Sequence, residues 1–169
     1  MATDPTPVSL LPACPACDLV RACREEPHPL FVAELASGLL VLHEDQRPVG
    51  RLRLVAKAHL ADVLALSDGE REALWRDLDL VVRAMRAALG PRRLNLATPP
   101  DGAADGHLVW ELVPRGDEAP AEAGLPWWEL EAASLEAEAV ADLKRRLLRG
   151  FLAVAPVRRM VPTPGRRRL

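Results

Sequence analysis

The stretch DQRPVGRLRLVAKAHL occupies residues 45–60 and is followed at Ser67 by a helix-start signal. Residues 50–55, GRLRLV, alternate apolar and basic side chains, which predicts a strand with one buried face and one wet face. Ser67 and Glu70 form an S-x-x-E capping box, and apolar residues then recur at helical spacing as far as Leu89, before Gly90 and Pro91. The chain is therefore predicted to place a strand immediately before a long amphipathic helix.

Shorter apolar runs on both sides of this unit predict four more strands and one more helix. Residues 31–35 and 39–42 are split by Ser37-Gly38, which indicates a hairpin. Residues 94–97 are apolar, and residues 107–113, HLVWELV, alternate with period two until Pro114, which we expect to end the strand. A second helix is predicted from about residue 130 to residue 151. Short connections favour an α+β fold, an antiparallel sheet of about five strands with two main helices.

Length and composition predict one domain with loose ends. The chain has 169 residues and 49% hydrophobic content, enough to bury a core. Residues 1–13 contain three prolines and no periodicity, so we expect a flexible N-terminal arm. Residues 14–155 form the expected domain, including the C-terminal helix, and residues 156–169 form an expected basic, disordered tail.

Charge and hydropathy limit the classes of partner. The formal net charge is -2, which provides no global attraction to nucleic acid, and the arginines at 166–168 are interpreted as a solubilising end. No run of 18 apolar residues and no signal-peptide pattern is present. We therefore expect a cytoplasmic protein without membrane or nucleic-acid partners.

Cysteines and histidines provide the strongest chemical signal. Three cysteines cannot all pair with one another, and a C-x-x-C in a reducing compartment is more often a metal or redox element than a structural disulfide. The four candidate zinc ligands are Cys14, Cys17, His59 and His107. Two alternatives are a pair of small apolar cysteines in a loop and a redox couple, although the flanking strand and helix of a thioredoxin-like unit are not evident. His28 and His43 are interpreted as solvent-exposed, and Cys23 receives no predicted role.

The motifs and their order resemble one known family. Residues 45–60 resemble the pattern D-x-x-P-x-x-G-H-x-L-V-x-P-K-x-H, and LNLATPPDGAADGHLVWELVPR, residues 94–115, resembles the region ending in H-x-H-x-H-x-x-P-R. CPAC resembles C-P-F-C, and AGLPWWEL, residues 123–130, resembles a G-P-I-W-E segment. Together they are similar to zinc-bearing bacterial histidine triad (HIT) proteins, which are related to galactose-1-phosphate uridylyltransferases. The resemblance implies a HIT-like fold, a homodimer, and zinc held by the same four residues, Cys14, Cys17, His59 and His107.

Departures from the family pattern concern the catalytic residues. The resemblance places Val109 where the family has its nucleophilic histidine, and valine has no lone pair with which to form a phosphoramidate. Glu111 stands in place of the third histidine and would repel a phosphate unless it is protonated or paired with Arg51, Arg115 or a cation. A second interpretation is that Glu111 is simply solvated. Asp105 also argues against an anion site.

The expected function follows from these departures. We expect a zinc-binding HIT-like protein that lacks nucleotidyl transfer and hydrolase activity and acts as a ligand-binding or regulatory module for a nucleoside or another small molecule. Its ligand-binding residues are expected to be Asp45, Asn95, Glu111 and Arg115. The alternative is a HIT-related nucleotide hydrolase or transferase that uses Glu111 in a non-standard site. A redox protein built on Cys14 and Cys17 is a third class.

Overall fold

The computed structural model of the chain describes residues 14–26, 28–98, 106–116 and 131–154. Helix α1 spans Pro15–Glu25, α2 spans Asp68–Leu89 and α3 spans Ala137–Val154, and a short 3-10 turn, η1, covers Val63–Ala65. The strands are β1 (Phe31–Glu34), β2 (Gly38–Leu42), β3 (Leu52–Ala56), β4 (Arg93–Ala97) and β5 (Val109–Arg115). The predicted N-terminal arm, the basic tail, Asp105 and the segment 123–130 lie outside the described residues. No helix in the described ranges is both long and apolar enough to cross a membrane.

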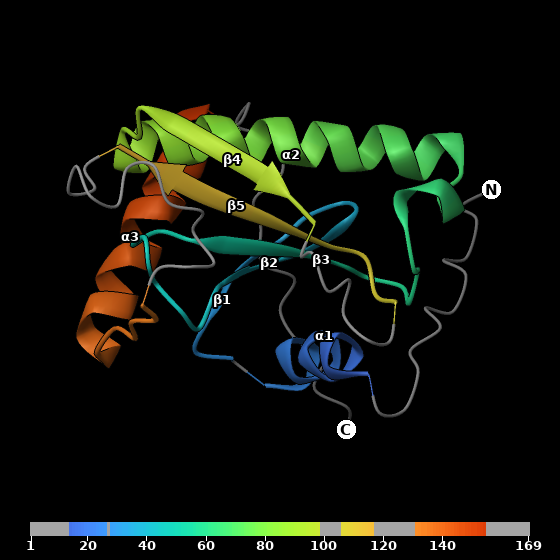
Figure 1. Ribbon diagram of the computed structural model, residues 1–169, viewed down its shortest axis with the longest axis horizontal. Helices are drawn as coiled ribbons and strands as arrows, with labels where there is room; N and C mark the ends of the chain where they lie inside the picture. The colour runs from blue at the N-terminus through green and yellow to red at the C-terminus, as the bar shows by residue number, and fades with distance from the viewer. Residues whose placement is uncertain (1–13, 27, 99–105, 117–130, 155–169) are drawn as a thin grey trace, which may run out of the picture.

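The five strands form one sheet in the order β1-β2-β3-β5-β4, and all neighbouring strands are antiparallel. This arrangement confirms the predicted α+β fold with a five-stranded antiparallel sheet. It carries three helices rather than two, since α1 was not predicted. In Figure 1 the sheet lies between α2 and α1, which stand on opposite sides of it.

Side chains along the strands point alternately to the two faces of the sheet, and apolar side chains form a separate layer on each face. One face of β2, β3 and β5 joins α2 and α3 in the larger core, in which Leu40, Leu54 and Leu112 are at most 1% exposed. The other face contributes Leu39, Val41, Val55 and Val109 to a smaller cluster closed by Val20 of α1. Both faces of the sheet are thus partly covered, and α1 covers the face that carries the candidate site.

Local sequence sets both ends of α2, and a glycine on α3 lets the two helices pack closely. The capping box of Ser67 and Glu70 opens α2, and Gly90 closes it in the left-handed conformation at φ 63°. On α3, Gly150 packs directly against α2, where an added Cβ would collide with the carbonyl oxygen of Ala84. This close contact fixes the helix pair that supports the back of the sheet.

Three predicted boundaries were wrong. Residues 15–25 are helical, although no helix was predicted there. Helix α3 begins at Ala137 rather than near residue 130, because the backbone of Ala133 is bonded to the β2–β3 connection: Asp45 accepts its N–H and the Gln46 N–H donates to its carbonyl. Strand β5 begins at Val109 rather than at residue 107 and continues through Pro114, which is tolerated where pairing with β3 has ended at Leu112 and only β4 remains alongside.

Candidate metal centre and the neighbouring ion cluster

The first turn of α1 positions both cysteines. Cys14 is the N-cap of the helix, and its Sγ accepts a hydrogen bond from the backbone N–H of Cys17 at 3.3 Å. Pro15 occupies the first helical position, where its missing N–H costs nothing. Both cysteines are buried, at 1% and 0% exposure. The C-x-x-C spacing thus becomes one helical turn that holds two sulfur atoms on the same side.

The two histidines approach these sulfurs from the sheet. His107 precedes β5, and its Nδ1 lies 3.5 Å from Cys14 Sγ and 3.4 Å from Cys17 Sγ. His59 follows β3, and its Nδ1 lies 3.4 Å from Cys17 Sγ. The two imidazole rings stand perpendicular, with centroids 5.3 Å apart. The four ligand atoms all lie within 4.8 Å of one another, so this group could hold a metal ion.

The spacing of the four side chains suits tetrahedral zinc. Zinc bonds of about 2.3 Å to sulfur and about 2.0 to 2.1 Å to nitrogen place S and N about 3.6 Å apart in a tetrahedron, close to the observed separations. His107 Nε2 lies 2.9 Å from the carbonyl oxygen of Ala56. Because a carbonyl only accepts, Nε2 carries the proton and Nδ1 keeps its lone pair toward the cysteines. This orientation is the one that a metal-binding histidine requires.

Val109, two residues after His107, is the first residue of β5. Its side chain is 8% exposed and packs in the small apolar cluster with Val55 of the paired strand β3 and Val20 of α1. An aliphatic side chain in this setting can neither attack a phosphorus atom nor carry a proton.

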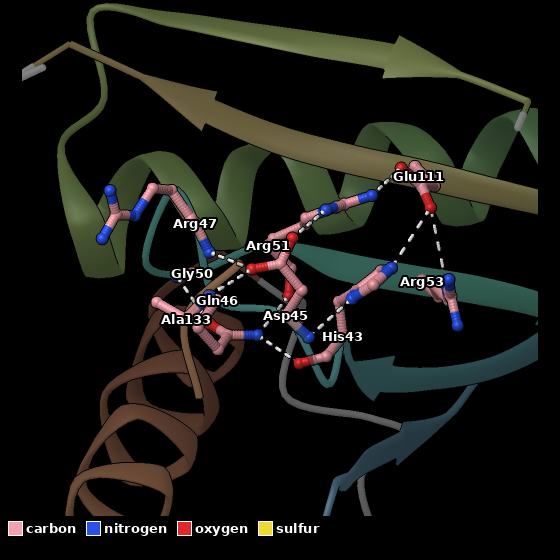
Figure 2. Close-up of polar contacts among 9 residues, drawn as sticks. All are labelled: His43, Asp45, Gln46, Arg47, Gly50, Arg51, Arg53, Glu111 and Ala133. Atoms are coloured by element: carbon pink, nitrogen blue, oxygen red, sulfur yellow. Dashed lines mark hydrogen bonds and ion pairs between the residues drawn. The ribbon is translucent and has the colours of Figure 1, made fainter. Parts of the chain in front are cut away.

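Glu111, two residues further along, lies in the middle of a partly buried ion cluster that we define as His43, Asp45, Arg51, Arg53 and Glu111 (Figure 2). Arg51 Nη2 donates to Glu111 Oε2 at 2.8 Å, and Arg51 Nη1 donates to Asp45 Oδ2 at 2.8 Å. His43 Nε2 and Arg53 Nε lie 3.4 Å and 3.5 Å from Glu111 Oε1. One carboxylate thus faces three basic side chains.

The surroundings keep Glu111 ionised. Burial alone would raise the pKa of this carboxyl, but hydrogen bonding and charge from His43 and Arg51 outweigh burial and lower the pKa to about 2. Glu111 is only 4% exposed. The interpretation of Glu111 as a solvated carboxylate was therefore wrong, and so was that of His43 as an exposed histidine, since His43 is 9% exposed and accepts from the Asp45 N–H.

Asp45 and Gln46 connect the ion cluster to the segment before α3. Asp45 Oδ1 accepts from the N–H groups of Arg47 and Ala133, at 3.0 and 2.9 Å. The side chain of Gln46 donates to the carbonyls of His43 and Arg51 and accepts from the Gly50 N–H. The β2–β3 connection is thereby held in one conformation with Arg51 aimed at Glu111.

The four residues predicted to bind a ligand lie near one another. Strand register places Asn95 opposite Val113 and Arg93 opposite Arg115, so Asn95, Glu111 and Arg115 share one face of the sheet. Asp45 joins them through Arg51. Sequence reasoning did not assign His43 and Arg53 to this site. The alternation of Arg51 and Arg53 on a strand that pairs with Glu111 is the signal that would have found the second arginine.

Known proteins resemble this chain in structure rather than in sequence. No protein-family model matches the sequence, and no curated protein matches it. Among solved structures, a hypothetical histidine triad nucleotide-binding protein from Sulfolobus tokodaii matches with a TM-score of 0.65 at 18% identity, over 83% of this chain and 93% of that chain. This chain has the histidine triad fold.

Two further structures with this fold are similar. A zinc-bound histidine triad family protein from Mycobacterium smegmatis matches with a TM-score of 0.61 at 18% identity, over 83% of this chain and 97% of that one. A histidine triad protein from Sinorhizobium meliloti matches with a TM-score of 0.62 at 20% identity, over 72% of this chain and 88% of that one. At these identities the likeness concerns the histidine triad fold alone.

Proposed function

We propose that this chain is a zinc-binding protein of histidine triad fold that has lost nucleotidyl transfer and acts as a ligand-binding or regulatory module. One observation carries the proposal. His107, just before β5, lies in the metal centre, and β5 places Val109 in an apolar cluster and Glu111 in the ion cluster. None of the three side chains is left in a position to act as a nucleophile.

The zinc has a structural role in this proposal. Four protein donors, Cys14, Cys17, His59 and His107, complete a tetrahedron and leave no position for water or substrate. The bound ion would join α1 to the ends of β3 and β5. We further propose that the protein works in the cytoplasm, where reducing conditions keep both cysteines available as thiolates for the metal.

Val109 and Glu111 correspond, in this proposal, to the second and third positions of a degenerate triad. The relation to galactose-1-phosphate uridylyltransferases rests on the sequence motifs. A nucleoside or another small molecule would be bound on the face that carries Asp45, Asn95, Glu111 and Arg115. The alternative, an enzyme that uses Glu111, is less well supported because a carboxylate with a pKa of about 2 is a weak base.

Turnover assays test this proposal. We expect the purified, zinc-loaded protein to hydrolyse adenosine phosphoramidate and dinucleoside polyphosphates at no more than background rate, because the covalent nucleophile is missing. A catalytically active histidine triad hydrolase, assayed in parallel, is the positive control. Turnover that co-purifies with the protein and disappears in Glu111→Gln would overturn the proposal and establish the enzyme alternative.

We also propose that the protein is a homodimer in which β4 and α2 meet a second copy. β4 lies at one edge of the described sheet. Beside it, Trp75 of α2 is 50% exposed and stacks edge-on against Trp110 of β5 at 5.6 Å, and Leu96 of β4 is 41% exposed. An exposed edge strand flanked by large apolar side chains is normally covered by another chain.

Sedimentation velocity tests the dimer. The native protein is expected to sediment as two chains, and Trp75→Glu is expected to sediment as one, because a charge in the centre of an apolar interface has no partner. Leu152→Glu is the matched control, since Leu152 is an exposed leucine on α3 and is expected to leave the dimer intact. A monomeric native protein, or a dimeric Trp75→Glu, contradicts the proposed interface.

A further inference from the structure

Helix α1 is attached to the sheet by two sets of contacts. Its apolar side contributes Val20 to the small cluster on the side of the sheet opposite α2 (Figure 1). Within the described residues, its polar contacts with the sheet all run through Cys14 and Cys17, whose sulfur atoms lie 3.4 to 3.5 Å from the histidine nitrogens. If these cysteine contacts are lost, only the small apolar cluster holds α1 in place.

The two sulfur atoms are also placed to bond with each other. Cys14 is the N-cap of α1, and Cys17 lies one helical turn later, with its N–H donating to Cys14 Sγ at 3.3 Å. Helix geometry places Cα atoms three residues apart at about 5 Å, within the range of about 4.4 to 6.8 Å that disulfides span. The ligand atoms of the metal centre, both sulfurs included, lie within 4.8 Å of one another. A disulfide can therefore close within the first turn of α1 while the helix is kept.

His59 is the side of the metal centre that opens most readily. His107 is 4% exposed, and the Ala56 carbonyl oxygen fixes its Nε2 at 2.9 Å. His59 is half-buried, and among the described residues its Nε2 has no hydrogen-bond partner. A ligand histidine without such a partner is held less firmly. Because both cysteines are buried, we expect a small oxidant to reach them when His59 turns away.

We propose that Cys14 and Cys17 form a peroxide-sensitive switch that couples metal binding to the position of α1. One thiolate sulfur attacks an oxygen of hydrogen peroxide, the O–O bond breaks, and the sulfur becomes a sulfenic acid as the other oxygen leaves as water. The second thiolate displaces the hydroxyl group from that sulfur, and the disulfide forms. Overall the two thiolates give two electrons to one peroxide, which takes up two protons from solvent and leaves as two waters.

Oxidation removes the polar attachment of α1, because disulfide sulfurs no longer serve as thiolate ligands. The apolar side chains that α1 helps to cover are at most 8% exposed, and the release of α1 uncovers them: Leu39, Val41, Val55 and Val109. Helices α2 and α3 pack on the other face through a separate and larger core, so that part of the fold remains. The reduced and the oxidised protein thus present different surfaces.

The inference rests on the zinc centre of the proposed function, and the two can fail separately. A protein that binds no zinc overturns both. A zinc-loaded protein that does not respond to peroxide overturns the switch alone and leaves the proposed function intact.

The test is treatment of the zinc-loaded full chain with hydrogen peroxide. A colour-forming chelator measures released zinc, and mass spectrometry of peptides locates the disulfide. The native protein is expected to release about one zinc per chain, to join Cys14 to Cys17, and to bind zinc again after a thiol reductant is added. Hydrogen–deuterium exchange of the α1 amides is expected to become at least about tenfold faster, while exchange in α2 stays the same.

Two variants serve as matched controls. Cys14→Asp keeps an N-cap acceptor and offers an oxygen ligand to zinc but cannot form the disulfide, so it is expected to release zinc at least about tenfold more slowly than the native protein. Cys23→Ser removes the third cysteine, which lies outside the metal centre, and is expected to respond as the native protein does.

Several outcomes overturn the switch. They are a native protein that keeps its zinc in peroxide, zinc release with both cysteines still reduced, unchanged exchange in α1 after oxidation, and zinc-loaded Cys14→Asp that releases zinc as fast as the native protein. If Cys14→Asp binds no zinc, the location of the disulfide in Cys23→Ser and its reversal by reductant decide instead.

Discussion

Cys14→Ser and His107→Ala are each expected to lose stoichiometric zinc and to melt at least 10 °C below the native protein. In the proposed centre the metal would join α1 to the sheet, and binding of a structural zinc supplies apparent free energies on the order of 10 kcal/mol, comparable to the whole stability of a domain. A strong chelator added to the native protein should lower its melting temperature in the same way. Metal analysis and calorimetry of the same samples provide both readouts.

Cys23→Ser is the matched control for these variants. Cys23 also lies on α1, is half-buried and stands outside the metal centre. Burial raises the pKa of its thiol, an effect that Lys144 partly opposes, so Cys23 is a poor source of thiolate. Cys23→Ser is expected to keep full zinc. Full zinc in Cys14→Ser, or loss of zinc in Cys23→Ser, would show that the ligand set is misassigned.

Glu111→Gln is expected to destabilise the protein at pH 7 by about 3 kcal/mol, measured by urea unfolding. Removing one charge leaves Arg51 and Arg53 buried or half-buried without their shared partner, a change that typically costs 3 to 5 kcal/mol. Glu72→Gln, which removes an exposed carboxylate paired with Arg76 on α2, should change stability by less than about 0.5 kcal/mol. Equal stability of native protein and Glu111→Gln would mean that the ion cluster contributes nothing.

The difference in stability between the native protein and Glu111→Gln is expected to depend on pH. The folded pKa of Glu111, about 2, lies below its ordinary value of 4.5, so its contribution to stability is complete above pH 4.5 and is lost as the pH falls towards 2. The native protein and Glu111→Gln should therefore differ most above pH 5 and converge in acid. Both proteins are expected to release zinc as acid protonates its ligands, so the difference between their curves of stability against pH isolates the contribution of Glu111. A difference that is constant with pH contradicts the assigned charge state.

Helices and strands whose sequence has strong periodicity were predicted correctly. Helix α1, whose periodicity is weaker, was missed. The capping box at Ser67 and the alternation of residues 50–55 predicted α2 and β3 closely. Helix α1 was missed because its polar residues and the prolines in and around it, Pro12, Pro15, Pro27 and Pro29, suggested turns and loops. Its apolar positions, Ala16, Leu19, Val20 and Cys23, do recur at helical spacing, and Pro15 stands at the first helical position, so the signal was present.

The residues of the candidate metal site could be predicted from the sequence. The burial and charge pairing of Glu111 could not. Two cysteines on one turn and two histidines in strand context were sufficient to select the four residues that the structure gathers. The burial of Glu111 was not predictable, because it depends on how His43, Arg51 and Arg53 from two other strand segments meet across the sheet register. The alternation of Arg51 and Arg53 is visible in the sequence, but it does not tell which side chains meet across neighbouring strands.

X-ray absorption at the zinc edge of the purified native protein tests the central claim most directly, since it reports both the presence of the metal and its complete set of ligands. The proposal predicts one zinc per chain with two sulfur atoms at about 2.3 Å and two nitrogen atoms at about 2.0 to 2.1 Å, a closed tetrahedron supplied by Cys14, Cys17, His59 and His107. The spectrum should not change when nucleoside phosphates are added. A protein purified without zinc, or a spectrum with fewer protein ligands and an exchangeable oxygen in the fourth position, would contradict the structural role assigned to the metal.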